Sequence, residues 1–243
     1  MTSPPPFEAV ITAAGDSRRR FLDAGFGVPK SLVVVAGKSV LQRAFESYAA
    51  LATQAAVAIN KEEDEEWQVG KMLRASFPEA TVTSVPSAVK GALVSALFAL
   101  ETPDPGLPLL VTSGDSEVAG GIAHYVALFL QSGAACGTLV FRSSNPRWSY
   151  VSVDEEGGVL QVAEKEVIGQ FASTGAYFFS SRDLFLEAAE WVLMNEATLN
   201  GQFYTSTTLN YALAQGLDVS VHEISRTEYK SWSLPHDFVC QTP

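Results

Sequence analysis

The first half of this chain alternates short apolar runs with longer segments of helical periodicity, and this pattern constrains the fold more than any other feature. The apolar, β-branched runs predict buried strands at residues 7–12, 32–35, 55–59, near 82 and at 108–112. Ser39 can cap a helix whose apolar residues recur on one face, and residues 91–100 are apolar nearly all round, as in a buried helix. Strands alternating with helices in this way predict an α/β architecture with a largely parallel sheet.

The second half predicts a different arrangement. Strands are expected at 135–141, 150–153, 159–163 and 219–223, and helices at 183–194 and 207–214. A Glu-Glu-Gly-Gly turn joins the second and third of these strands, so we expect a hairpin there. Together the two halves predict a Rossmann-like three-layer α/β/α fold with a mixed, mostly parallel central sheet. After a flexible leader at 1–6, residues 7–243 are expected to form one domain with two halves, 7–118 and 119–243.

Composition narrows the class of protein. The 243 residues carry a formal net charge of -11, which argues against nucleic acid or an anionic membrane as a partner. No apolar run reaches the roughly 18 residues of a membrane span, and the first residues lack a basic region followed by an apolar stretch, so we expect neither a membrane span nor an export signal. Cys136 and Cys240 fit no metal or redox spacing, so we expect reduced thiols in a cytoplasmic protein. The acidic segment 62–66 predicts the start of a solvated helix.

Residues 13–29 lie between two predicted strands and carry glycines, arginines and a proline without clean periodicity, which is typical of a functional loop. Five cations gather in and after this loop: Arg18, Arg19, Arg20, Lys30 and Lys38. No G-x-G-x-x-G comes after the first strand, which leaves a dinucleotide fold without direct support. Lys30-Ser31 is not a P-loop either, because Pro29 precedes it and a strand is expected after it.

The loop and the segment after it resemble the signature of the sugar-phosphate nucleotidyltransferases, through Ala13-Ala14-Gly15 and the stretch "RFLDAGFGVPKSLVVVAGKSVLQRAFES". This family transfers a nucleoside monophosphate from an NTP to a small phosphorylated acceptor and releases pyrophosphate. The resemblance implies catalytic roles for Arg20 and Lys30, and nucleotide binding by Ala13, Ala14, Gly15, Arg18 and Gly91. One extra residue precedes Arg20, and Asp16 stands where the family has a second glycine. The residue types suit the chemistry, since glycine lets backbone N–H groups approach a nucleotide and guanidinium binds phosphate bidentately.

Asp115 comes after the strand expected at 108–112, at the end where open α/β sheets place their ligands. The segment "LLVTSGDSEV" resembles the one in which the family carries its magnesium-binding aspartate. The resemblance therefore implies Mg²⁺ as cofactor, held by Asp115. Mg²⁺ usually takes one or two carboxylates together with substrate phosphates.

A second resemblance covers "WSYVSVDEEGGVLQVAEKEVIGQFASTGAYFFSS" and "GQFYTSTTLNYAL", which look like a subgroup found in capsule and surface-polysaccharide gene clusters. It implies that Glu164, Lys165 and Gly175 bind the acceptor. The family often has a second metal ligand near the C-terminus, and Trp232 falls at that place. The aromatic residues Trp148, Tyr150, Tyr177 and Tyr204 are interpreted as core or sheet residues.

Two other functions compete with this hypothesis. A nucleotide-sugar-dependent glycosyltransferase shares the fold type, but a diphosphate donor needs no triphosphate clamp of the Arg20-to-Lys30 kind. A non-catalytic nucleotide-sensing subunit is favoured by the missing glycine and by Trp232. The nucleotide is left open, with CTP or UTP suggested by the subgroup, and the acceptor is a sugar 1-phosphate or another small phosphate. The oligomeric state is also open.

Overall fold

A computed structural model describes residues 5–100 and 106–239. The strands are β1 (Glu8–Ala13), β2 (Val34–Val35), β3 (Lys38–Ser39), β4 (Gln54–Asn60), β5 (Thr81–Val85), β6 (Leu109–Ser113), β7 (Ser116–Val118), β8 (Cys136–Arg142), β9 (Ser149–Val153), β10 (Val159–Glu164), β11 (Phe171–Phe179), β12 (Val219–Glu223) and β13 (Tyr229–Ser231). The helices are α1 (Arg18–Asp23), α2 (Val40–Tyr48), α3 (Lys61–Trp67), α4 (Val69–Ser76), α5 (Ala92–Ala99), α6 (Ala123–Ser132), α7 (Arg182–Met194), α8 (Thr208–Ala214) and α9 (His236–Val239), with 3₁₀ turns η1 (Lys30–Leu32) and η2 (Thr205–Thr207).

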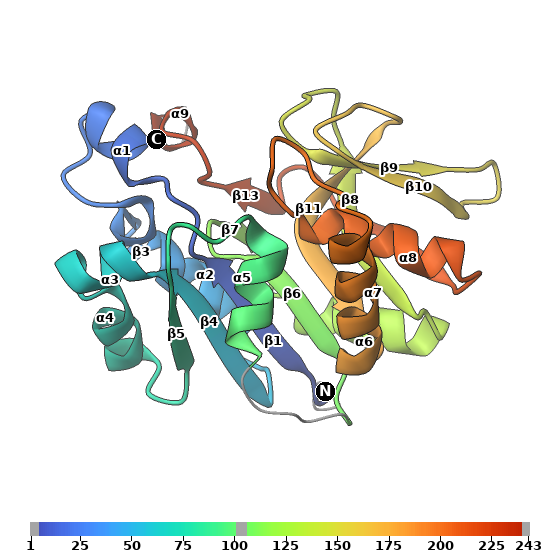
Figure 1. The fold of residues 1–243 in the computed structure, drawn as a ribbon, viewed down its shortest axis with the longest axis horizontal. Coiled ribbons are helices and arrows are strands. Elements are labelled where there is room, and N and C mark those ends of the chain that lie inside the picture. The colour runs from blue at the N-terminus through green and yellow to red at the C-terminus, as the bar shows by residue number, and fades with distance from the viewer. Residues whose placement is uncertain (1–4, 101–105, 240–243) are drawn as a thin grey trace.

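The main sheet has nine strands, seven of them in the order β10-β9-β11-β6-β1-β4-β5, and β8 pairs with both β11 and β12 (Figure 1). β6, β1, β4 and β5 are parallel, as are β8 and β12. β11 pairs antiparallel with β6, β8 and β9, and so joins the two halves of the sheet. The Rossmann-like α/β class and the mixed central sheet are thereby confirmed.

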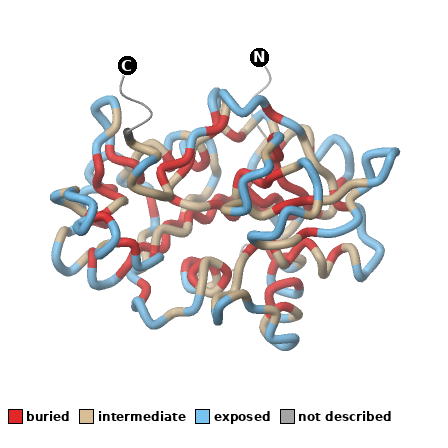
Figure 2. The backbone as a smooth tube through the Cα atoms, turned by 90° about the horizontal axis from the view of Figure 1, so that it is seen from above, coloured by how far each residue is buried: buried red, intermediate tan, exposed pale blue. Residues whose placement is uncertain are grey.

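Alternation along the central strands produces two apolar faces. In β1, Ala9 and Ile11 belong to one buried cluster and Val10 to the other, because successive side chains point to opposite faces. The first cluster packs against α2 and α6, and the second against α5, α7 and α8. Figure 1 shows α5 and α7 in front of the sheet and α2 behind it, and Figure 2 shows the buried residues running through the middle of the molecule. Helices therefore cover both faces, which gives the three layers expected.

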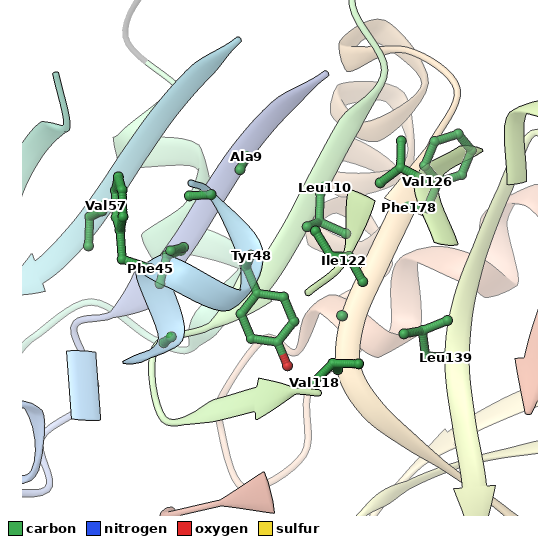
Figure 3. Packing of buried hydrophobic residues seen from close by; sticks show 14 of the residues in the cluster. Ala9, Phe45, Tyr48, Val57, Leu110, Val118, Ile122, Val126, Leu139 and Phe178 are labelled. Atoms are coloured by element: carbon green, nitrogen blue, oxygen red, sulfur yellow. The ribbon is translucent and has the colours of Figure 1, made fainter. Parts of the chain in front are cut away.

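Helix α2 shows how the sequence fixes one of these layers. Ser39 caps it through a capping box with Gln42, in which each side chain bonds the other residue's backbone N–H. Phe45 and Tyr48 recur on its inner face, and Figure 3 shows Phe45 beside Val57 of β4 and Tyr48 reaching toward Val118 of β7. The predicted cap and apolar face of this helix are confirmed.

Several predicted elements differ from the structure. The segment 13–29 is not all loop, because it contains the short helix α1, in which Phe21 alone is buried. Of the strand expected at 32–35, only Val34–Val35 forms, and it pairs with β3 outside the main sheet. Phe98 on α5 is 47% exposed, so that helix is not buried all round. Glu63 belongs to the segment expected to be solvated, yet it is 4% exposed.

Within the two described stretches, no helix is both long enough and apolar enough to cross a membrane. Cys136 is a buried free thiol in β8, and Cys240 lies outside the described residues. The leader at 1–6 also falls mostly outside them.

Candidate functional site

β1, β4, β5 and β6 all end at one edge of the sheet, because they are parallel and in near register. α1, α9 and β13 lie above this edge in Figure 1. A cavity of about 380 Å³ opens there, and we call it the glycine-loop cavity. Its wall consists of Thr12, Ala13, Ala14, Gly15, Asp16, Ser17, Lys30, Ser31, Glu63, Ser87, Val89, Gly91, Ala92, Ser95, Ser113, Gly114, Asp115 and Gln202.

A larger cavity of about 620 Å³ adjoins it toward β9, β10 and β11, and we call it the hydroxyl-lined cavity. Its wall consists of Thr12, Arg20, Lys30, Ala92, Thr112, Ser113, Asp115, Arg147, Trp148, Ser149, Glu164, Lys165, Ser173, Thr174, Gly175, Tyr177, Tyr204, Thr205, Ser206, Tyr229, Ser231, Ser233 and Leu234. Five residues line both cavities: Thr12, Lys30, Ala92, Ser113 and Asp115. Of the charged residues predicted from sequence, Lys30 and Asp115 therefore stand where the two spaces meet.

Lys30 and Asp115 form an ion pair at this junction, with 2.5 Å between Nζ and Oδ2. Pro29, in extended conformation, precedes the η1 turn that carries Lys30, and Asp115 comes after β6. Burial alone would raise the pKa of the Asp115 carboxyl. The Lys30 ammonium, with hydrogen bonds from Lys30 and Ser113, instead brings that pKa below its ordinary value of 3.8. Asp115 is thus held as a carboxylate, ready to bind a cation.

The Asn60 side chain holds the loop after β1 in place through hydrogen bonds. Its Nδ2 donates to the Ala14 carbonyl over 3.2 Å and to Ser87 Oγ over 2.9 Å. Asn60 also caps α3 by accepting from the Glu63 backbone N–H. One side chain therefore ties the ends of β1 and β4 to the loop after β5, beside Ala14 and Gly15 in the cavity wall.

Gly91 occupies a position that only glycine tolerates. Its φ is +102°, and an added Cβ would lie 2.2 Å from the Phe203 carbonyl oxygen. The Phe203 backbone bonds both sides of it, donating to the Lys90 carbonyl over 3.0 Å and accepting from the Leu93 N–H over 3.2 Å. The close approach brings the segment around Phe203 against the start of α5, at the wall of the glycine-loop cavity.

Glu63 is a buried carboxyl group in the same wall. Its Oε2 lies 3.4 Å from Ser31 Oγ, and its Oε1 is buried with no hydrogen-bond partner among the described residues. Burial raises the pKa of Glu63 from 4.5 to about 7, against the opposing effect of the nearby Lys30. Its ionisation near neutral pH therefore carries a free-energy cost for the folded state.

The three residues assigned to the acceptor lie together on the hydroxyl-lined cavity. Glu164 accepts hydrogen bonds from Ser149 Oγ and, over 2.8 Å, from Ser206 Oγ. Lys165 has a φ of +55°, and its Nζ donates to the Tyr204 hydroxyl over 2.5 Å. Gly175, with a φ of +80°, lies in the irregular stretch of β11 between Ser173 and Tyr177.

The arginines of α1 separate in the structure. Arg20 lines the hydroxyl-lined cavity, and no ion pair engages it within residues 5–100 and 106–239. Arg18 lies outside both cavity walls, and its Nη1 bonds the Glu66 carboxylate. Arg19 is exposed and lies near Asp23. The structure therefore brings Arg20, Lys30 and Asp115 around one space and places Arg18 elsewhere.

Trp232 does not face the cavities. It is fully buried with Phe21, Val33 and Val40, while its backbone N–H donates to the Asp115 carbonyl over 2.8 Å. Its neighbours Ser231 and Ser233 line the hydroxyl-lined cavity instead. No cluster of three or more His, Cys, Asp or Glu side chains suited to a metal occurs in the described part of the chain. The donor set fits Mg²⁺ only as one carboxylate, Asp115, completed by hydroxyl, water or substrate oxygens.

Asn60 and three residues of the cavity walls, Glu63, Arg147 and Tyr204, have roles at the site that were not predicted from sequence. Arg147 pairs with Asp237 over 2.7 Å and lies 4.0 Å from the Trp148 ring centroid. Tyr204, interpreted from sequence as a core residue, is half-buried at the cavity wall. Asn60 follows the strand predicted at 55–59 and precedes the predicted acidic helix, a position typical of an N-cap residue, so this role could have been anticipated. The other three carried no comparable pattern.

Comparison with solved structures shows the same fold in proteins of low sequence identity. A nucleoside-diphosphate-sugar pyrophosphorylase from Vibrio cholerae RC9 is similar at 20% identity and a TM-score of 0.80, with 96% of this chain and 98% of that chain covered. The inositol-1-phosphate CTP transferase from T. maritima is 15% identical with a TM-score of 0.70, over 96% and 92% of the two chains. A UDP-glucose pyrophosphorylase complexed with UDP-glucose is 17% identical with a TM-score of 0.72, over 97% and 96%.

Among curated protein sequences, none matches this chain. The model of one family does match, over residues 9–189, which include the glycine loop, Lys30, Asp115 and the acceptor-side pair Glu164 and Lys165. That span is well over half of the 243 residues. The chain therefore belongs to the family described as the MobA-like NTP transferase domain.

Proposed function

We propose that this protein transfers a nucleoside monophosphate from an NTP to a sugar phosphate or a similar small phosphate, with release of pyrophosphate. The observation that carries the proposal is the junction of the two cavities, where the Lys30 ammonium and the Asp115 carboxylate lie 2.5 Å apart. A nucleotide in the glycine-loop cavity would present its α-phosphate there, and an acceptor in the hydroxyl-lined cavity would reach the same point. Residues 7–118 would then supply most of the nucleotide site and 119–243 most of the acceptor site.

The acceptor phosphate needs no general base. With a second pKa of about 6, a phosphate monoester is already largely a dianion at neutral pH. One of its oxygens forms a bond to the α-phosphorus as the bond from that phosphorus to the bridging β-phosphate oxygen breaks, and pyrophosphate leaves. Catalysis then depends on positioning and on stabilising negative charge.

The chain's own residues suit these two tasks. Lys30 would stabilise charge on the transferring phosphate, and Arg20, which has no ion-pair partner in the described ranges, would bind phosphate oxygens bidentately. Lys165 would bind the acceptor's phosphate, and Glu164 would accept from one of its hydroxyls. Ala13 to Gly15 and Gly91 would hold the nucleoside through backbone contacts.

Mg²⁺ would be held by Asp115, the carboxylate that pairs with Lys30 in this structure. Bound there, the ion would supply neutralisation of phosphate charge. The Lys30–Asp115 ion pair keeps both side chains in place at the junction of the two cavities, where Lys30 would bind phosphate.

The sequence resemblance and the cavity wall both bear on the finer identity of the substrates. The resemblance of "GQFYTSTTLNYAL" to capsule-cluster enzymes favours a precursor of a surface polysaccharide. CTP or UTP is suggested by the same resemblance. The many hydroxyl groups of the hydroxyl-lined cavity suit a polyhydroxylated acceptor.

The test is a matrix of four NTPs against phosphorylated acceptors, read by pyrophosphate release with Mg²⁺ and with EDTA. We expect one NTP–acceptor pair to turn over, and only with the metal. Lys30→Ala and Asp115→Ala should each lower kcat by about a hundredfold, corresponding to roughly 3 kcal/mol. Lys38→Ala is the matched control, because Lys38 pairs with Glu46 on the exposed surface.

Each alternative function predicts a different result. A glycosyltransferase would consume a nucleotide-sugar without releasing pyrophosphate from an NTP. A nucleotide-sensing subunit would bind an NTP with no turnover in any combination. Near wild-type rates in Lys30→Ala and Asp115→Ala would refute the roles given to these residues.

A further inference from the structure

The positive charge of Lys165 is not neutralised by any carboxylate among the described residues. Its Nζ donates to the Tyr204 hydroxyl over 2.5 Å and lies 4.4 Å from the centroid of the Tyr204 ring. Within residues 5–100 and 106–239 it forms no ion pair, although Glu164 is its neighbour in sequence. Glu164 is engaged instead by the hydroxyls of Ser149 and Ser206. Lys30 differs from Lys165 in this respect, because the Asp115 carboxylate neutralises its charge.

A neutral partner of this kind has a physical advantage for binding an anion. A free lysine side chain samples many rotamers, and ordering it on ligand binding is unfavourable. The Tyr204 ring and hydroxyl restrict the side chain before the ligand arrives, through a hydrogen bond and a cation–π contact. Unlike a carboxylate, they do not compete with phosphate for the ammonium charge.

The residues on either side of Tyr204 in the sequence are attached to the walls of both cavities. The preceding residue, Phe203, makes the two backbone hydrogen bonds around Gly91. Gln202 lines the glycine-loop cavity, and Ser206 donates to Glu164 in the hydroxyl-lined cavity. The segment 202–206 therefore contacts the walls of both cavities, and Tyr204 stands between its two points of attachment.

We infer that Tyr204 is the positioning residue of the acceptor site, which presents the Lys165 ammonium to the phosphate of an anionic acceptor. The identity of that acceptor rests on the proposed function. The contact between Tyr204 and Lys165 is observed in the structure and is independent of the proposed function. The Lys165 backbone, with its φ of +55°, is held in a conformation uncommon for lysine, as expected where a side chain must be aimed.

Two substitutions separate the contributions of Tyr204. Tyr204→Phe removes the hydroxyl and keeps the ring, so the acceptor KM should rise about fivefold, as for a lost hydrogen bond. Tyr204→Leu removes both, and the KM should rise about tenfold or more. In both variants the NTP KM should stay within about twofold of wild type, since neither removes a nucleotide contact. Tyr211→Phe is the control, because that hydroxyl contacts Glu187 on the exposed surface.

A binding measurement keeps this test independent of turnover. Calorimetry with glucose 1-phosphate compares wild type, Lys165→Ala and both Tyr204 variants, with circular dichroism confirming the fold. We expect affinity to fall in the order wild type, Tyr204→Phe, Tyr204→Leu, Lys165→Ala. If Lys165→Ala weakens binding while both Tyr204 variants bind like wild type, the inference is overturned and the proposed function stands. If no NTP–acceptor pair turns over but this order holds, the proposed function fails alone. If the wild type does not bind glucose 1-phosphate, the same comparison is made with the acceptor that turns over in the NTP matrix, and a wild type that binds no phosphorylated acceptor of that matrix contradicts both.

Discussion

Replacing Glu63 with glutamine tests whether a buried carboxyl in the glycine-loop cavity costs the protein stability. Glu63 is 4% exposed, and its Oε1 has no partner among the described residues. Glutamine has nearly the same shape and keeps an acceptor for the Ser31 hydroxyl, but it cannot ionise. The substitution therefore removes the titration of this group and little else.

The magnitude is set by the pKa. Burial raises the pKa of Glu63 from 4.5 to about 7, so the folded state binds this proton more tightly than the unfolded state does. The wild-type free energy of unfolding should therefore decrease as the pH rises from 4.5, and the loss is complete above about pH 7. Each unit of pKa corresponds to about 1.4 kcal/mol, so the full effect is about 3.5 kcal/mol.

The assay is urea unfolding of wild type and Glu63→Gln at about pH 5 and about pH 8.5. The variant should gain about 2 to 3 kcal/mol relative to wild type between these two conditions, because only the wild type must ionise a buried carboxyl. Glu65→Gln, which removes an exposed carboxylate from the same helix, is the control. A stability difference between Glu63→Gln and wild type that is the same at both pH values would refute the reasoning.

Two further substitutions test the packing that supports the site. Gly91→Ala should destabilise the protein by about 2 kcal/mol or more and weaken NTP binding, because its Cβ would lie 2.2 Å from the Phe203 carbonyl oxygen. Gly133→Ala is the control, because Gly133 has a φ of +73° but no heavy atom within 4 Å of an added Cβ. In urea unfolding it should lower the free energy of unfolding by only about 1 kcal/mol. If Gly91→Ala and Gly133→Ala lower it equally, the clash with Phe203 is not the cause. Arg182→Ala should cost about 3 to 5 kcal/mol, because it leaves the Glu8 carboxylate buried without its partner. Thermal unfolding measures the loss of stability. The double variant Glu8→Gln, Arg182→Ala should recover part of it, because it no longer buries an unpaired carboxylate. If the double variant does not recover stability, the buried charge is not the cause.

The sequence carries enough information for the parallel half of the sheet. The strands β1, β4 and β6 are short apolar runs, with a turn or the start of a helix directly after each, and such runs are typical of buried strands. The position of Asp115 could also be anticipated, because parallel strands deliver the residues after them to one edge. Lys30 comes after α1 and not directly after a strand, so its contact with Asp115 could not be predicted from the strand pattern.

Other features depend on tertiary contacts that no local pattern encodes. β11 was not predicted, because Ser173, Thr174 and Gly175 interrupt its apolar run at the irregular stretch that lines the cavity. α1 was not predicted either, since it buries only Phe21 and has no apolar face. The burial of Glu63 within an acidic helix, and the contact of Tyr204 with Lys165 across 39 positions, arise only from the folded arrangement.

The five residues common to both cavities place the two spaces side by side, as neighbouring parts of one trough. A single inhibitor could therefore span it, with a nucleoside portion at one end and a sugar portion at the other, joined through phosphates beside Lys30. Binding one bisubstrate compound costs the translational entropy of one molecule, whereas binding the two fragments separately costs that of two. The affinity of the compound should therefore exceed that of either fragment by a large factor. The geometry of the trough thus defines the spacing that a chemist would build into the linker.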